Sequence, residues 1–146
     1  MVEPKTSDVI VGTYAKTNQF YRSNNEGDTF TGLDCTKIAG YYPQKYDYDE
    51  TNSRMIIAFA AADVENAGNT TKGCVGYLNI NTNAFTTSVL PNTDNTAGGQ
   101  PVAGVAVYDK NPDYLIATSF ATNGRYGSVK GDTYGTHIFL SKNPYM

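Results

Sequence analysis

The sequence predicts an all-β protein, and three observations carry this prediction. The 146 residues include 14 glycines and 12 tyrosines but no tryptophan, and asparagine and threonine are common, a mixture typical of strands and turns. No segment shows the apolar period of about 3.6 residues that marks a helix. Instead, short β-rich runs alternate with Gly, Asn, Asp and Pro. Ten such runs are found: Val9–Tyr14, Phe20–Ser23, Thr29–Leu33, Lys45–Tyr48, Met55–Ala60, Cys74–Asn79, Ala84–Leu90, Val102–Tyr108, Tyr114–Phe120 and Thr136–Ser141.

Three of these runs repeat one pattern. Asp8–Thr13, Arg54–Phe59 and Asp113–Thr118 are each an apolar strand that follows a polar turn. Each is followed by a loop and then by a strand containing an aromatic residue. This order is typical of the four-stranded antiparallel blade of a β-propeller. We expect the second strand of a blade to be the most apolar, because neighbouring blades cover both of its faces.

The repeats divide the chain into about two and a half blades. We expect a partial blade over residues 1–36, a full blade over 37–91 and a partial blade over 92–146. Known propellers close with roughly four to eight blades, and an open arc exposes apolar faces and unpaired strand edges. The sequence therefore indicates a partial propeller, whose remaining blades come from a longer parent chain or from other copies.

Charge and hydropathy restrict the possible partners. The net charge is −3 and no Lys/Arg cluster follows one face, so nucleic acid is not expected. The longest apolar run, Met55–Ala62, is too short to span a bilayer. Met1–Lys5 lacks the apolar segment of a signal peptide, which leaves a removed leader and an excised piece both open. Cys35 and Cys74 likewise leave open one disulfide or two half-buried thiols.

Residues 20–30 contain a motif with a structural meaning. Ser23, Asn25, Gly27, Thr29 and Phe30 resemble the Asp-box S-x-D-x-G-x-T-W, with Asn in place of Asp and Phe in place of Trp. This box is a tight hairpin turn in the propeller blades of sialidases and several glycan hydrolases. The Asx side chain caps backbone amides and the glycine takes a positive φ. The aromatic residue is expected to fill the space between blades.

Further segments resemble xyloglucanases of glycoside hydrolase family 74. Ile38–Lys45 is similar to an inter-blade loop of that family, Thr70–Thr82 to its T-K-G strand, and Val102–Thr118 to a strand–turn–strand segment. The resemblance implies two propellers that hold a xylose-branched β-1,4-glucan in a cleft. It also implies an inverting mechanism with two Asp residues on opposite walls. The stretches around those two residues have no counterpart here, so no catalytic residue is assigned, and no cofactor or metal is expected.

Loops on one face of a propeller normally carry the site. These are the loops that join the second strand to the third and one blade to the next, and the longest here is Ala121–Gly135. Tyrosine rings stack on the apolar faces of sugars, and charged groups bind hydroxyls. The candidate glycan-binding residues in these loops are Tyr41, Tyr42, Arg125, Tyr126, Asp132 and Tyr134.

Other polar groups are weaker candidates. Asp63 and Glu65 are neighbours on one loop and cannot flank a glycosidic bond. Asp47–Glu50 lacks the spacing of a calcium loop, so a solvated turn is expected there. A sialidase-like site needs three arginines, but the chain has only Arg22, Arg54 and Arg125, and Arg22 lies in a blade strand.

Two functions remain open. The first is a segment of a secreted, extracellular endo-hydrolase of xyloglucan or a related β-1,4-glucan, inactive alone because the catalytic Asp pair lies elsewhere. The second is a non-catalytic propeller that binds glycans or serves as a scaffold. The expected partner is a polysaccharide, xyloglucan or a related β-glucan, and no membrane partner is expected.

Overall fold

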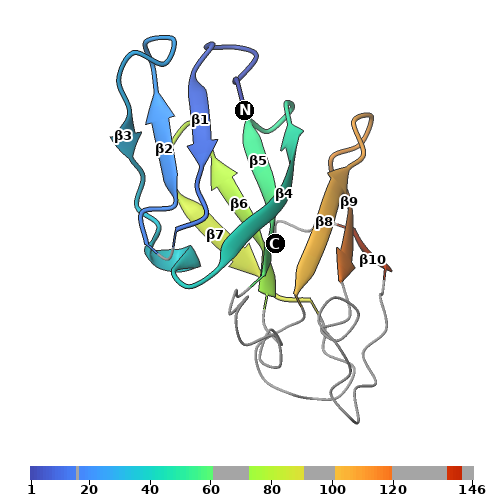
Figure 1. Ribbon diagram of the computed structural model, residues 1–146. Helices are drawn as coiled ribbons and strands as arrows, with labels where there is room; N and C mark the ends of the chain where they lie inside the picture. Colours follow the sequence, from blue (N-terminus) through green and yellow to red (C-terminus); the bar gives the residue numbers. More distant parts are fainter. Residues whose placement is uncertain (16, 61–72, 91–100, 120–137, 143–146) are drawn as a thin grey trace.

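The computed structural model describes residues 1–15, 17–60, 73–90, 101–119 and 138–142. These residues form strands and one short 3₁₀ turn, which confirms the all-β prediction (Figure 1). In chain order the elements are β1 (Val9–Gly12), β2 (Phe20–Ser23), β3 (Thr31–Gly32), η1 (Thr36–Ile38), β4 (Tyr42–Asp49), β5 (Arg54–Ala60), β6 (Gly73–Asn79), β7 (Phe85–Ser88), β8 (Val102–Val107), β9 (Tyr114–Ser119) and β10 (Ile138–Lys142).

The strands form three antiparallel sheets. Sheet 1 has the order β1-β2-β3, sheet 2 has β4-β5-β6-β7, and sheet 3 has β8-β9-β10. Consecutive strands are neighbours throughout, as in the blade pattern that the repeats predict. The first strands of sheets 2 and 3, β4 and β8, also contact each other directly. Figure 1 shows them running side by side.

Every predicted run overlaps a strand, but several limits differ. β4 begins at Tyr42 rather than Lys45, because a bulge between Pro43 and Lys45 lets pairing with β5 continue to the end of that strand. β3 is shorter than predicted and pairs with β2 only over Thr31 and Gly32.

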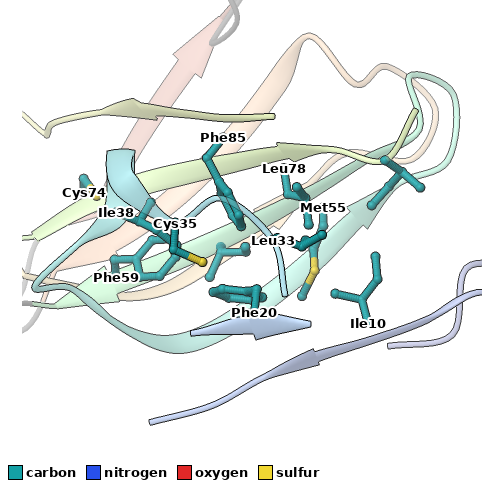
Figure 2. Close-up of a cluster of buried hydrophobic side chains, with 12 residues drawn as sticks. Ile10, Phe20, Leu33, Cys35, Ile38, Met55, Phe59, Cys74, Leu78 and Phe85 are labelled. Atoms are coloured by element: carbon teal, nitrogen blue, oxygen red, sulfur yellow. The ribbon is translucent and has the colours of Figure 1, made fainter. Parts of the chain in front are cut away.

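β5 is buried on both faces, as expected for the second strand of a blade, and β6 beside it is buried to the same extent. Met55, Ile57 and Phe59 face a first core between sheets 1 and 2, while Ile56 and Ala58 face a second core against sheet 3. Figure 2 shows the first core, where Phe20 of β2 points toward side chains of sheet 2. Its ring lies 5.3 Å from that of Phe85, between centroids.

Cys35 and Cys74 are both buried as free thiols in the first core. The sequence leaves open a disulfide or two free thiols, and the structure has the free thiols. Burial raises the pKa of the Cys74 thiol to about 12, so this sulfur stays protonated at neutral pH.

Two charged groups, the buried Glu3 and the half-buried Arg22, fasten sheet 1 to sheet 2. Glu3, only 1% exposed, accepts hydrogen bonds from the Tyr48 hydroxyl at 2.6 Å and from the backbone amide of Lys5 at 2.9 Å. Arg22 on β2 pairs with Asp8 and also donates to the carbonyl oxygen of Ile80. A charged group with several partners is stable where an unpaired one is not.

Candidate functional site

An aromatic pair lies at the edge of the molecule where β1 ends and β4 begins. The rings of Tyr14 and Tyr42 have centroids 4.4 Å apart and planes inclined by 36°. Tyr14 keeps 60% of its surface exposed, and Tyr42 is half-buried. The pair therefore presents an aromatic surface to solvent.

A buried amide holds the two segments together. Gln19 is fully buried, and its side-chain nitrogen donates to the carbonyl oxygen of Tyr41. The backbone carbonyl oxygen of Gln19 accepts from the backbone amide of Thr13 at 2.7 Å. The connection between β1 and β2 is thus tied to the residue before Tyr42, which places Tyr14 against Tyr42.

Strand pairing locates this pair relative to the predicted loops. Tyr42 is paired with Ala60 across β4 and β5, and Ala60 is paired with Gly73 across β5 and β6. Residues 61–72 connect Ala60 to Gly73, so this row of paired residues is the point from which that loop leaves the sheet. We call the edge defined by Tyr14, Tyr42, Ala60 and Gly73 the tyrosine rim.

The predicted candidates are only partly within the described residues. Tyr42 lies at the tyrosine rim. Tyr41 is half-buried against the first core, and burial raises the pKa of its hydroxyl. The remaining candidates lie outside the described residues and stay predictions: Arg125, Tyr126, Asp132 and Tyr134.

Tyr14 was missed by the sequence reasoning. It lies at the end of a predicted strand, Val9–Tyr14, rather than in a loop, and nothing in its local sequence marks it as a site residue. What places Tyr14 beside Tyr42 is the hydrogen bond between Gln19 and Tyr41, two residues that are 22 positions apart in the sequence.

The turn over residues 23–30 is built by short side chains. The Asn25 side-chain oxygen accepts from the Thr29 amide at 3.0 Å, and the Ser23 hydroxyl oxygen accepts from the Gly27 amide at 2.9 Å. Gly27 has φ +99°. Phe30 is 45% exposed among the described residues, and its role in filling a space between blades stays a prediction.

Both aspartates of the Asp47–Glu50 segment make structural contacts. Asp49 is buried and binds Arg54 and Asn52, and an Asp47 oxygen accepts from the Val107 amide of sheet 3 at 2.8 Å. The expectation of a solvated turn over Asp47–Glu50 is therefore wrong for both aspartates. Among the residues that the structure describes, no cluster of His, Cys, Asp or Glu is arranged to hold a metal ion. Nor does any helix within those residues have the length and apolarity to cross a membrane.

Comparison with known proteins identifies the fold. No protein-family profile and no curated protein sequence matches the chain. A solved structure of a GH74 enzyme from Niastella koreensis matches 98% of it with TM-score 0.69 and 22% identity. The GH74 xyloglucanase from Xanthomonas campestris matches 93% with TM-score 0.66 and 15% identity.

At these identities the matches establish the fold alone. The three sheets are blades of a β-propeller, which confirms the predicted fold class. The chain covers 20% of the length of the first of these structures and 18% of the second.

Proposed function

We propose that this chain is a segment of a secreted propeller hydrolase that acts on xyloglucan or a related β-1,4-glucan. The tyrosine rim supplies glycan contacts in this proposal, and the catalytic Asp pair lies outside these residues. The observation that carries it is the exposed Tyr14–Tyr42 pair at the rim of a fold shared with GH74 enzymes. Aromatic rings of this kind stack on the apolar face of a pyranose.

The partial blades fit the same proposal. In it, residues 1–36, 37–91 and 92–146 form three consecutive wedges of one ring, and the other wedges come from a longer parent chain or from further copies. The exposure of apolar residues on sheet 3, including Leu140 at 68%, supports this arrangement, because a neighbouring blade would cover them.

The carboxylates favour a second candidate to be tested beside the first. In the described residues, Glu3, Asp8 and Asp49 are engaged with Tyr48, Arg22 and Arg54. Inverting glycosidases instead need two carboxyl groups about 6.5–9.5 Å apart with water between them. A glycan-binding or scaffold propeller without catalysis would show the same structural use of its acids.

Retention on immobilised glycan tests the proposal. In affinity electrophoresis through xyloglucan, we expect the chain to be retarded, and Tyr42→Ala to weaken retention roughly fivefold, for about 1 kcal/mol of ring stacking. Tyr46 is a matched control, since it is 52% exposed but does not belong to the tyrosine rim. If xyloglucan retards Tyr42→Ala and Tyr46→Ala equally, or does not retard the unsubstituted chain at all, the proposal is wrong.

Reducing-sugar release separates the two functions. We expect this chain to bind xyloglucan without releasing sugar, and a longer parent chain to release it. Binding without release from either protein would select the non-catalytic alternative.

A further inference from the structure

The two rings of the tyrosine rim stand next to residues that are tied to one another. Tyr14 follows Thr13 in the chain, and Tyr42 follows Tyr41. Gln19 is hydrogen-bonded to both of these preceding residues. Its backbone carbonyl oxygen accepts from the Thr13 amide at 2.7 Å and from the Thr13 hydroxyl at 3.2 Å, and its side-chain nitrogen donates to the carbonyl oxygen of Tyr41. A single residue therefore links the backbone on which each ring stands.

The backbone of Gln19 has a fixed place in sheet 1. Asn18 has φ +54°, a left-handed conformation that asparagine adopts more readily than most residues. The chain turns there and then enters β2, whose first residue, Phe20, begins the pairing with β1. Because the backbone of Gln19 is held at the end of this pairing, the reach of its side chain determines where Tyr41 lies.

The hydrogen bonding of the Gln19 amide is one-sided. The side chain has no exposed surface. Its nitrogen donates to Tyr41, but its oxygen accepts from no residue that the structure describes. A buried acceptor without a donor costs free energy that offsets much of what one hydrogen bond contributes. The contact with Tyr41, rather than a large gain in stability, is thus what glutamine supplies and an apolar side chain of similar length, such as methionine, does not.

We propose that Gln19 is a positioning residue for glycan binding, which sets the separation and tilt of the Tyr14 and Tyr42 rings without touching the glycan. This rests on the proposed function, because it concerns the same tyrosine rim. With centroids 4.4 Å apart and planes inclined by 36°, the two rings form one surface. Ordering side chains at the moment of binding costs affinity. Gln19 lowers this cost by holding the two rings together before the glycan arrives.

Gln44 provides a matched control. Its side-chain nitrogen donates to the carbonyl oxygen of Tyr42 at 3.1 Å, so it forms the same kind of bond beside the same ring. The two residues lie two positions apart on β4, and this bond does not reach the segment that carries Tyr14. Gln44→Met therefore removes an amide–carbonyl bond from the rim but leaves the link made by Gln19 in place.

Nuclear Overhauser contacts between the two rings test the positioning without any glycan. We expect the parent chain and Gln44→Met to show contacts between Tyr14 and Tyr42, and Gln19→Met to lose most of them. The equilibrium constant for unfolding of Gln19→Met should change by less than about tenfold. The reason is that losing the bond to Tyr41 and losing the unpartnered oxygen act in opposite directions.

Thr13→Val is a milder variant of the same link. It removes the hydroxyl that donates to Gln19 at 3.2 Å but keeps the backbone amide bond. We expect it to weaken the ring contacts in part and to reduce xyloglucan retention about twofold. It carries the test if Gln19→Met does not fold, and ring contacts identical to those of the parent chain would then count against the proposal.

A double-mutant cycle separates positioning from a general structural role. In affinity electrophoresis through xyloglucan, Gln19→Met should weaken retention by about twofold to fivefold, no more than Tyr42→Ala does. In a Tyr42→Ala background the same substitution should have no further effect, because no ring pair is left to position. A role in overall stability would instead make the two losses additive.

Three outcomes would overturn the assignment of Gln19. They are ring contacts that survive in Gln19→Met, additive losses in the cycle, or a loss of retention in Gln44→Met as large as in Gln19→Met. Failure of the proposed function looks different. In that case the ring contacts depend on Gln19 as expected, but xyloglucan does not retard the parent chain.

Discussion

Gly76 creates the space in which the most buried aromatic ring of the first core lies. Phe59 on β5 is paired with Cys74 on β6, and Gly76 is two residues further along on the same face. A Cβ built on Gly76 would lie 2.9 Å from Cδ2 of Phe59 and closer still to Cε2. Phe59 is fully buried, and the edge-to-face contact with Phe20 at 6.1 Å restricts its retreat. Gly76→Ala should therefore overpack the core.

The expected cost follows from these contacts. Overpacking costs about 1–3 kcal/mol, while replacing glycine with alanine returns about 0.4–1 kcal/mol through the unfolded chain. Because the ring cannot move freely, we expect a net loss of about 2 kcal/mol. In a chain of this length, that lowers Tm by roughly 4–8 °C. Urea unfolding followed by far-ultraviolet circular dichroism measures the loss.

Two further variants identify the cause. Gly32 has no atom nearer than 3.8 Å to a built Cβ, so Gly32→Ala should change stability by less than about 0.5 kcal/mol. In the Gly76→Ala background, Phe59→Leu should cost much less than in the parent chain, because leucine relieves the clash. A Gly76→Ala chain as stable as the parent, or additive effects of the two substitutions, would refute this account of the core.

Two other predictions concern buried ionisable groups. Burial raises the pKa of Glu3, but hydrogen bonds from Tyr48, Thr6 and Lys5 outweigh it and hold the pKa below its ordinary value of 4.5. The stabilisation is therefore complete above that value and is lost as the pH falls through the lowered pKa. Glu3→Gln should cost about 1.5–3 kcal/mol at pH 7 and less in urea unfolding at pH 3, and a difference that does not change with pH would contradict this. In a Cys35→Ser background, the Cys74 thiol should resist a disulfide reagent at pH 8 until urea unfolds the chain, since burial raises its pKa to about 12; rapid labelling of the native chain would show that this thiol is accessible.

The strands were predictable because each is a local pattern. β5 has apolar residues at nearly every position, which indicates burial on both faces, and the two cores on either side of it have this origin. Strand limits were less predictable, because they depend on the partner strand. Tyr42 joins β4 through its pairing with Ala60, a contact that no local pattern encodes.

The candidate site was predictable only for residues in loops. Tyr42 is a candidate because its sequence position lies between blades. Tyr14 contacts Tyr42 only because the buried Gln19 ties the two segments together, and this burial depends on the tertiary fold.

Glu3 and Asp49 resemble surface acids in the sequence, and their burial was not predicted. Asp49 is held by the nearby Asn52 and Arg54, whereas Glu3 also accepts from the distant Tyr48 hydroxyl. These donors make the burial of both carboxylates tolerable.

β9 of sheet 3, like β5, has apolar side chains on both faces, but the outer face of sheet 3 is not covered by another sheet among the described residues. On β9, Leu115 and Ala117 are buried in the second core, but Ile116 between them is 45% exposed. Its partner on β10, Leu140, is 68% exposed, and Ile138 is 76% exposed. Side chains on opposite faces of one strand are apolar in this pattern, as they are on β5, where another sheet covers each face. The strand is therefore suited to packing on both sides, and in the proposed partial propeller a further blade would cover its exposed face.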